Sequence, residues 1–180
     1  MVFDYIERIS NLLRAEERKA GAQHGLQTVQ IEVLYYLFHC NRFSNTPAAV
    51  TEYMQLTKGT VSQTIRVIES KGLIEKQTDP LDKRVVHLLL TAEGKSVLAS
   101  SMPPPVFKEA LANLGDEIEP ALQHLLLALQ QATHSKGFGV CNSCKHCKPA
   151  TGDTFFCGLT NEPLSIGDIE LICREHSESS

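Results

Sequence analysis

Five of the six cysteines lie in the last forty residues of the chain, at positions Cys141, Cys144, Cys147, Cys157 and Cys173. The first three follow a C-x2-C-x2-C pattern, and the other two stand alone. A C-x2-C pair lets two thiolates face one metal, and two later cysteines can complete a four-thiolate site. A disulfide framework is the competing use. It is disfavoured because the start, MVFDYIERIS, lacks the apolar region of a signal peptide. This predicts a cytoplasmic location, where structural disulfides are rare.

Two kinds of metal centre stay open for these thiols. Four thiolates suit either a zinc ion or an iron–sulfur cluster. A zinc ribbon usually presents two C-x2-C knuckles, whereas C-x2-C-x2-C is part of the bacterial ferredoxin pattern, so the spacing favours iron–sulfur slightly. A segment this short, with few large apolar groups, would gain folding energy from structural zinc. Free or redox-active thiols are the third alternative.

The other candidate reactive residues indicate no further chemistry. Cys40 is expected to be a small buried hydrophobe. His176 follows Cys173 by three residues and could be a ligand or a hydrogen-bond donor to one, although a surface position is the simpler expectation. The sequence contains no P-loop, GxGxxG, GxSxG or HExxH motif and no convincing catalytic triad. We therefore predict that the chain is not an enzyme.

Charge is divided along the chain, although its formal net value is only -4. Between residues 58 and 87, six basic residues stand against four acidic ones, whereas residues 141–180 hold three basic and six acidic residues. The middle of the chain can therefore meet phosphate, and the tail would repel it. No apolar run approaches the ~20 residues that cross a bilayer, so no membrane partner is expected.

Two short helices with a three-residue turn between them are predicted in the middle of the chain, as in a helix-turn-helix. Thr46 and Thr57 are placed to cap them, and Pro47 suits the first helical position. The second helix has an apolar stripe of Val61, Ile65 and Ile68. Its other side carries hydroxyl, amide and guanidinium groups that can bond to bases or phosphates: Thr60, Ser62, Gln63 and Arg66.

A two-stranded ribbon is predicted directly after this helix. Gly72 suits the left-handed position that ends the helix. The segments LIEKQ and RVVHLLL are strand-like, and the turn-rich stretch TDPLDK joins them. Lys83 and Arg84 give this ribbon a cationic tip suited to phosphates or a narrow minor groove. Asp79 and Asp82 are expected to cap the turn rather than act as a catalytic pair.

Further helices are predicted on both sides of this segment, at about 3–20, 28–40, 91–101 and 106–134. The second is apolar on more than one side and is expected to be buried, with Ile31, Leu34, Leu37 and Phe38 marking it. Three prolines at 103–105 should interrupt the path, and the last helix should break near Leu114. That helix carries a packing seam of Ile118, Leu122, Leu125 and Leu129.

This order of elements resembles the MarR-type winged helix-turn-helix regulators over about three quarters of the chain. The resemblance is carried by TKGTVSQTIRVIESKGLIEK, DPLDKRVVHLLL and LTAEGKSVL. It implies a homodimer, joined by its first and last helices, that binds pseudo-palindromic operators and usually represses. By position, Arg84 matches the wing arginine that enters the minor groove, Asp82 its acidic support, and Ser62, Gln63 and Arg66 the recognition helix. The triple proline and the tail after residue 138 depart from the family core.

The stretch FFCGLTNEPLSIGDIELICREH also resembles a cysteine-rich tail that is found in a subset of these regulators. This second resemblance implies four metal ligands: Cys141, Cys144, Cys157 and Cys173. It leaves Cys147 as an alternate ligand.

We therefore predict a mainly α fold with a small β wing. Residues 1–134 would form a winged helix-turn-helix domain with flanking dimerisation helices, whose DNA-contacting lobe is about 46–90. Residues 135–180 would form a cysteine-rich metal-binding extension. The predicted function is DNA-binding transcriptional regulation, as a repressor, with a metal centre that senses redox or metal state by shifting the spacing of the two recognition helices. The alternatives are a small-molecule-responsive repressor with a structural zinc tail, and a non-DNA interaction or electron-transfer module.

Overall fold

The computed structural model describes residues 1–115, 117–152 and 154–178. In it, threonine side chains cap the starts of three helices. The side chains of Thr46, Thr57 and Thr91 each accept a hydrogen bond from the backbone N–H three residues later, at 3.2, 3.2 and 3.1 Å. These bonds satisfy N–H groups that the first turn of a helix leaves without partners. The capped helix starts that the sequence predicts are confirmed.

The helices agree closely with the sequence prediction. The interruption at the prolines and the break near Leu114 are both present, because one helix ends at Ser101 and another at Ala112. No helix in the described part of the chain is long and apolar enough to cross a membrane. In chain order the helices are α1 (Val2–Gln23), α2 (Thr28–His39), α3 (Pro47–Met54), α4 (Lys58–Ser70), α5 (Ala92–Ser101), α6 (Pro105–Ala112), α7 (Ile118–Ala132) and α8 (Ile166–Ile169), with a 3-10 turn, η1, at Cys141–Ser143.

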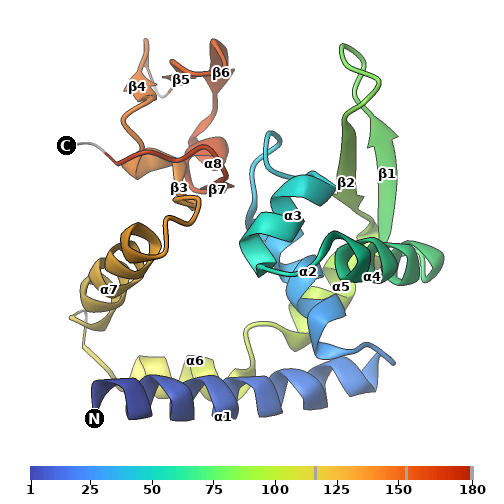
Figure 1. Ribbon diagram of the computed structural model, residues 1–180, viewed down its shortest axis with the longest axis vertical. Helices are drawn as coiled ribbons and strands as arrows, with labels where there is room; N and C mark the ends of the chain where they lie inside the picture. Colours follow the sequence, from blue (N-terminus) through green and yellow to red (C-terminus); the bar gives the residue numbers. More distant parts are fainter. Residues whose placement is uncertain (116, 153, 179–180) are drawn as a thin grey trace.

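The strands of the described residues form three small antiparallel sheets. β1 (Ile74–Thr78) and β2 (Val86–Leu90) make the wing, which projects away from the helices in Figure 1. Gly72 ends α4 at φ +71°, a left-handed conformation that glycine adopts without strain. The other two sheets lie in the extension: β3 (Gly139–Val140) pairs with β7 (Ile172–Cys173), and β5 (Phe155–Cys157) lies between β4 (Cys147–Pro149) and β6 (Glu162–Leu164).

The hydrophobic core surrounds α2, as its apolar composition predicts. Ile31 and Leu34 are fully buried there. The α4 stripe of Val61, Ile65 and Ile68 packs into the same core, which fixes which side of α4 faces outward. Phe38 is the exception on α2. The prediction that it is buried with its neighbours is wrong, because its side chain is 49% exposed.

The extension shares this core with the helices. Phe138, only 9% exposed, packs its ring against Tyr53 at 5.2 Å and Tyr36 at 6.2 Å between centroids. Ile172 packs against the same cluster from β7. Aromatic contacts of this kind bury a large apolar area and favour edge-on arrangements. Residues near the first and the last cysteine of the extension therefore anchor it to the lobe formed by α2–α5 and the wing.

Replacing Phe138 by alanine is expected to release the extension, because it removes the aromatic anchor and leaves a cavity beside Tyr36 and Tyr53. Loss of a buried phenylalanine costs about 3–5 kcal/mol. Limited proteolysis should then cut the Phe138→Ala variant within the extension much faster than the wild type. Phe156→Ala is the matched control, since Phe156 lies in β5 and is 37% exposed. Equal protection of the two variants would contradict this packing.

The flanking helices leave apolar side chains uncovered. All of α6 and α7 lies in described ranges, and none of their residues is buried. In the predicted seam of α7, Leu122 and Leu129 are each 53% exposed, while Ile118 and Leu125 are half-buried. In Figure 1, α1 runs along the end of the molecule opposite the wing. Its exposed apolar residues are Val2, Phe3, Tyr5, Ile6, Ile9 and Leu12.

Candidate functional site

The outward side of α4 presents the predicted polar residues to solvent. Thr60, Ser62, Gln63 and Arg66 are all exposed, on the side opposite the buried stripe. The Thr60 hydroxyl lies 2.9 Å from that of the capping residue Thr57, so this residue also helps to hold the start of the helix. The N-terminal half of α4 is therefore a rigid, polar, outward-facing surface of the size that enters a major groove.

The wing holds Arg84 in one orientation. Its Nε donates to Asp82 Oδ1 at 3.0 Å and its Nη2 to Oδ2 at 2.8 Å. This bidentate pair lowers the pKa of the Asp82 carboxyl, and it raises that of Arg84. The Arg84 side chain stays 90% exposed, and Lys83 beside it is exposed too. The predicted support of Arg84 by Asp82 is confirmed.

The turn of the wing is closed by Asp79, as the sequence predicts. Its Oδ1 accepts hydrogen bonds from the backbone N–H groups of Leu81, at 2.7 Å, and of Asp82, at 2.8 Å. His87 then connects this turn to the lobe, because its ring lies 3.1 Å from Asp79 Oδ2 and 2.6 Å from Asn45 Oδ1. Sequence reasoning assigns no role to His87. These contacts join His87 to residues that are 8 and 42 positions away in the sequence. No local sequence pattern reveals them.

The extension gathers its five cysteines around one small cavity of about 30 Å³. The β4–β5 pairing places Cys147 directly opposite Cys157. The 3-10 turn η1 carries Cys141, and Cys144 follows it, while β7 brings Cys173 to the same wall. Cys147 therefore lines the cavity with the four cysteines that the family resemblance implies as ligands.

These thiols are close to one another without forming a finished metal site. All six cysteines of the chain are free thiols. Burial, and then the neighbouring Cys147 thiol, raise the pKa of Cys141 to about 12. Within residues 1–115, 117–152 and 154–178, no three His, Cys, Asp or Glu side chains are arranged to hold a metal ion as they stand. Closing the site therefore requires thiol side chains to turn to other staggered positions.

Cys157 differs electrostatically from the other thiols of this cavity. Burial acts to raise its pKa, but hydrogen bonds from Thr160 and Leu159, together with the nearby Arg42 guanidinium, lower it overall. Thiolates are the form that binds metals, so a donor set of five thiols, one of them with a lowered pKa, suits a soft metal. The cavity therefore has donor atoms of the type that bind a soft metal, but their present positions do not form a complete coordination site.

The position of His176 differs from the one that the sequence predicts. The expected surface position is wrong, because the ring is only 9% exposed. Its Nε2 lies 2.9 Å from Ser143 Oγ in η1, and a Cβ on Gly139 would come within 2.7 Å of the ring. A glycine is therefore needed there for close approach. His176 braces the turn that carries Cys141, a packing role that its spacing from Cys173 does not suggest.

Cys40 lies outside the thiol cavity. It is 7% exposed within the core, and burial raises its pKa to about 12. The predicted role as a small buried hydrophobe is confirmed.

Two arginines near the extension have roles that the sequence does not signal. Arg174, next to Cys173, forms a two-bond ion pair with Glu52 of α3 and thereby lowers the pKa of that carboxyl. Arg42 precedes α3 and reaches across to β6 and α8. Both contacts span more than 100 residues of sequence, so neither spacing nor periodicity reveals them.

Comparison with known proteins supports this geometry. Residues 24–85 match the MarR family model. Transcriptional regulator HosA of Escherichia coli O111:H- is 33% identical over 86 residues, which are 47% of this chain and 64% of HosA. The match thus covers slightly less than two thirds of that relative.

The HTH-type transcriptional regulator YkoM of Bacillus subtilis (strain 168) is 26% identical over 141 residues, 73% of this chain and 90% of YkoM. Both names describe regulators, in agreement with the prediction that the chain is not an enzyme.

The fold is shared with solved structures of MarR family regulators. Sco3205 from Streptomyces coelicolor, described as a MarR family transcriptional regulator in complex with DNA, superposes with a TM-score of 0.59. That similarity covers 73% of this chain and 88% of Sco3205 at 20% identity, which shows the fold. Residues 24–85 match the MarR family model, and regulators of similar sequence and structure share the winged helix-turn-helix architecture, so the chain is similar to MarR family regulators over this lobe.

Proposed function

We propose that this chain is a transcriptional repressor that binds double-stranded operator DNA as a homodimer. The observation that carries the proposal is the pairing, in one lobe, of an exposed polar face on α4 with a wing arginine held by Asp82. In this arrangement α4 enters the major groove, where Gln63 and Arg66 reach base edges or phosphates. Arg84 then enters the adjacent minor groove, whose negative potential attracts arginine.

A second copy of the chain explains the uncovered helices. Leu122, Leu126 and Leu129 of α7 are each 53% exposed, and Phe3 of α1 is 72% exposed. Single proteins rarely leave so much contiguous apolar surface in water, so it supports an interface between copies. A two-fold dimer also sets two recognition helices about one DNA turn apart, which a pseudo-palindromic operator requires.

For the extension, we propose a thiolate-bound metal centre built from Cys141, Cys144, Cys157 and Cys173, with Cys147 as the alternate ligand. The shortness of the extension, with few large apolar groups to fold it, favours a structural zinc ion. The C-x2-C-x2-C spacing favours an iron–sulfur cluster instead. When bound, the metal supplies cross-links between η1, β5 and β7 that the small apolar core of the extension lacks.

A small-molecule-responsive repressor is the second candidate. An open groove of about 500 Å³ lies between the end of α7 and the extension. Leu127, Gln130 and His134 line it on the helix side, and His176 on the other. Its lining is mainly polar, so an effector held there would be polar rather than hydrophobic.

The test uses the anaerobically purified full chain and a random-sequence pool of DNA duplexes. The protein is expected to select duplexes with two similar half-sites, and to bind them as a dimer of twice the 19.9 kDa chain mass. Its affinity should fall steeply as salt rises, because phosphate contacts release counterions. A chain that stays monomeric, or that enriches no sequence, would contradict the proposal.

A further inference from the structure

The extension is bonded to the chain segment that leads into the helix-turn-helix. The backbone N–H of Asn41 donates to the Ile172 carbonyl at 2.9 Å, and that of Arg174 donates to Ser44 Oγ at 2.9 Å. Cys40 and Ile172 form a parallel bridge at the same place. The strand that carries Cys173 thus runs directly along the loop between α2 and α3.

An ion pair continues this contact onto α3 itself. Arg174 Nε donates to Glu52 Oε2 at 2.7 Å, and its Nη2 donates to Oε1 at 2.5 Å. The two side chains are only 28% and 35% exposed, so solvent screens the pair less than it would a fully exposed one. Bidentate arginine–carboxylate pairs fix orientation as well as distance. The residue after a proposed metal ligand therefore holds the first helix of the helix-turn-helix.

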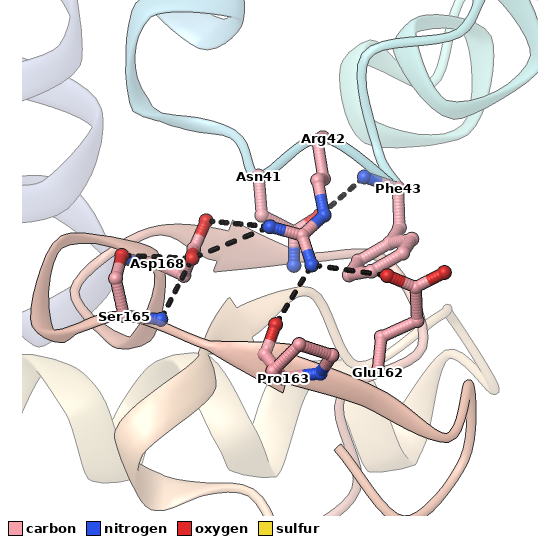
Figure 2. Close-up of polar contacts among 7 residues, drawn as sticks. All are labelled: Asn41, Arg42, Phe43, Glu162, Pro163, Ser165 and Asp168. Atoms are coloured by element: carbon pink, nitrogen blue, oxygen red, sulfur yellow. Dashed lines mark hydrogen bonds and ion pairs between the residues drawn. The ribbon is translucent and has the colours of Figure 1, made fainter. Parts of the chain in front are cut away.

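Arg42, in the loop between α2 and α3, makes a second connection, in this case from the lobe to the extension. Figure 2 shows its guanidinium between the carboxylates of Glu162 and Asp168. Its Nη2 donates to the Pro163 carbonyl at 2.8 Å and to Glu162 at 3.3 Å, and Nη1 lies 3.4 Å from Asp168. Asp168 also caps α8 through Ser165. The loop before α3 is thus fastened to both β6 and α8.

The thiol cavity itself is partly walled by this loop. Asn41 and Phe43 line it together with the cysteines. A change in the position of Cys173 or Cys157 therefore acts on residues that immediately precede α3. The cavity lies at the junction between the extension and the DNA-binding lobe rather than within the extension alone.

Movement of α3 is transmitted to α4 because the turn between them is short. Only residues 55–57 separate the two helices, and Gln55 adopts a left-handed conformation at φ 51°. The Leu56 N–H bonds back to the Thr51 carbonyl at 3.3 Å. A three-residue turn that is bonded to α3 leaves little freedom for α4 to stay in place when α3 shifts.

We propose that the extension is an intramolecular clamp, in which the Arg174–Glu52 ion pair couples the metal state of the thiol cavity to the position of α3 and thereby of α4. This inference rests on the proposed function, because it requires both a metal in the cavity and DNA on α4. With metal bound, Cys173 is fixed and Arg174 holds α3 in the DNA-binding orientation. Without metal, β7 loosens, the clamp opens, and operator affinity falls.

The experiment compares DNA binding by metal-loaded and chelator-treated protein, with the duplex that the wild type selects from a random pool as the probe. Allosteric couplings typically amount to about 5- to 150-fold in affinity, and a loss in this range is expected when metal is removed from the wild type. In the Glu52→Gln variant the loss should shrink to about twofold or less, while the metal content at saturation stays as in the wild type. Glu93→Gln removes one exposed carboxylate from α5 and is the matched control.

Two further measurements keep the result unambiguous. Arg174→Gln breaks the pair from the other side, and the double variant should lose no more coupling than either single variant. Amide hydrogen exchange in residues 47–54 should rise on metal removal in the wild type and rise less in Glu52→Gln. A wild-type response to metal that persists unchanged in both single variants would overturn the clamp alone. A wild type that holds no metal, or that binds no duplex, would instead overturn the proposed function on which the clamp rests.

Discussion

Replacing Arg84 by alanine is expected to lower operator affinity by about 30-fold or more. A base or phosphate contact made by one arginine is worth about 1–3 kcal/mol, and a homodimer loses two copies of it. Because the side chain is 90% exposed and its ion pair is with Asp82, two positions away, its removal should leave the fold intact. Fluorescence anisotropy with the selected duplex, read alongside the thermal unfolding midpoint, separates the two effects.

Lys95→Ala is the matched control for Arg84→Ala. Lys95 is an exposed cation on α5, so its loss changes the net charge equally without touching α4 or the wing. The salt dependence of Arg84→Ala should also be shallower than that of the control, because fewer counterions are released. Equal affinity of the two variants at every salt concentration would contradict a DNA-contacting wing.

Removing the metal, or replacing Cys173 by serine, is expected to unfold the extension. Structural zinc contributes about 10–16 kcal/mol to the folding of small zinc-finger peptides at neutral pH. The described part of the extension buries few side chains of its own, chiefly Cys141, Cys144, Leu164 and His176. Proteolysis should therefore remove the segment after residue 134, while the helical signal of the lobe persists.

Cys40→Ala is the control for the cysteine variants, because this thiol is buried in the lobe core and does not line the cavity. The Cys40→Ala variant should keep the metal. A separate variant, Cys147→Ser, shows whether the fifth thiol of the cavity is a ligand. Retention of a full complement of metal by Cys173→Ser would contradict the proposed ligand set.

The helical lobe is predictable because its signals are local. Thr46, Thr57 and Thr91 each cap a helix within three residues of themselves, and the α4 stripe repeats at helical spacing. The pairing of Asp82 with Arg84, two positions apart, follows from the resemblance of DPLDKRVVHLLL to the wing of the family. Periodicity and capping fix such elements wherever the rest of the chain lies.

The junction between extension and lobe is not predictable, because its contacts join distant parts of the chain. Arg174 meets Glu52 across 122 residues, and Arg42 meets Asp168 across 126. An arginine beside a cysteine resembles any solvated charge until a partner is placed next to it. The surface position predicted for His176 is wrong for the same reason, since its burial depends on Gly139 and Ser143.

This junction also changes how sensing would operate. The sequence suggests that the tail alters the spacing between the two recognition helices of a dimer. The structure places the thiol cavity against the loop before α3, with Asn41 and Phe43 in its wall. A signal at the cysteines therefore has a short path to α4 within one chain, through α3 and a three-residue turn.

The most direct test of the central claim, that the clustered thiols at this junction hold a metal, is a count of metals and reactive thiols in the anaerobically purified full chain. We expect one metal centre per chain and four of the five cysteines of the extension protected from alkylation until a chelator is added. Zinc without colour, or iron with absorbance near ~400 nm, would identify the centre. A metal-free chain in which all five cysteines of the extension react at once would contradict the account.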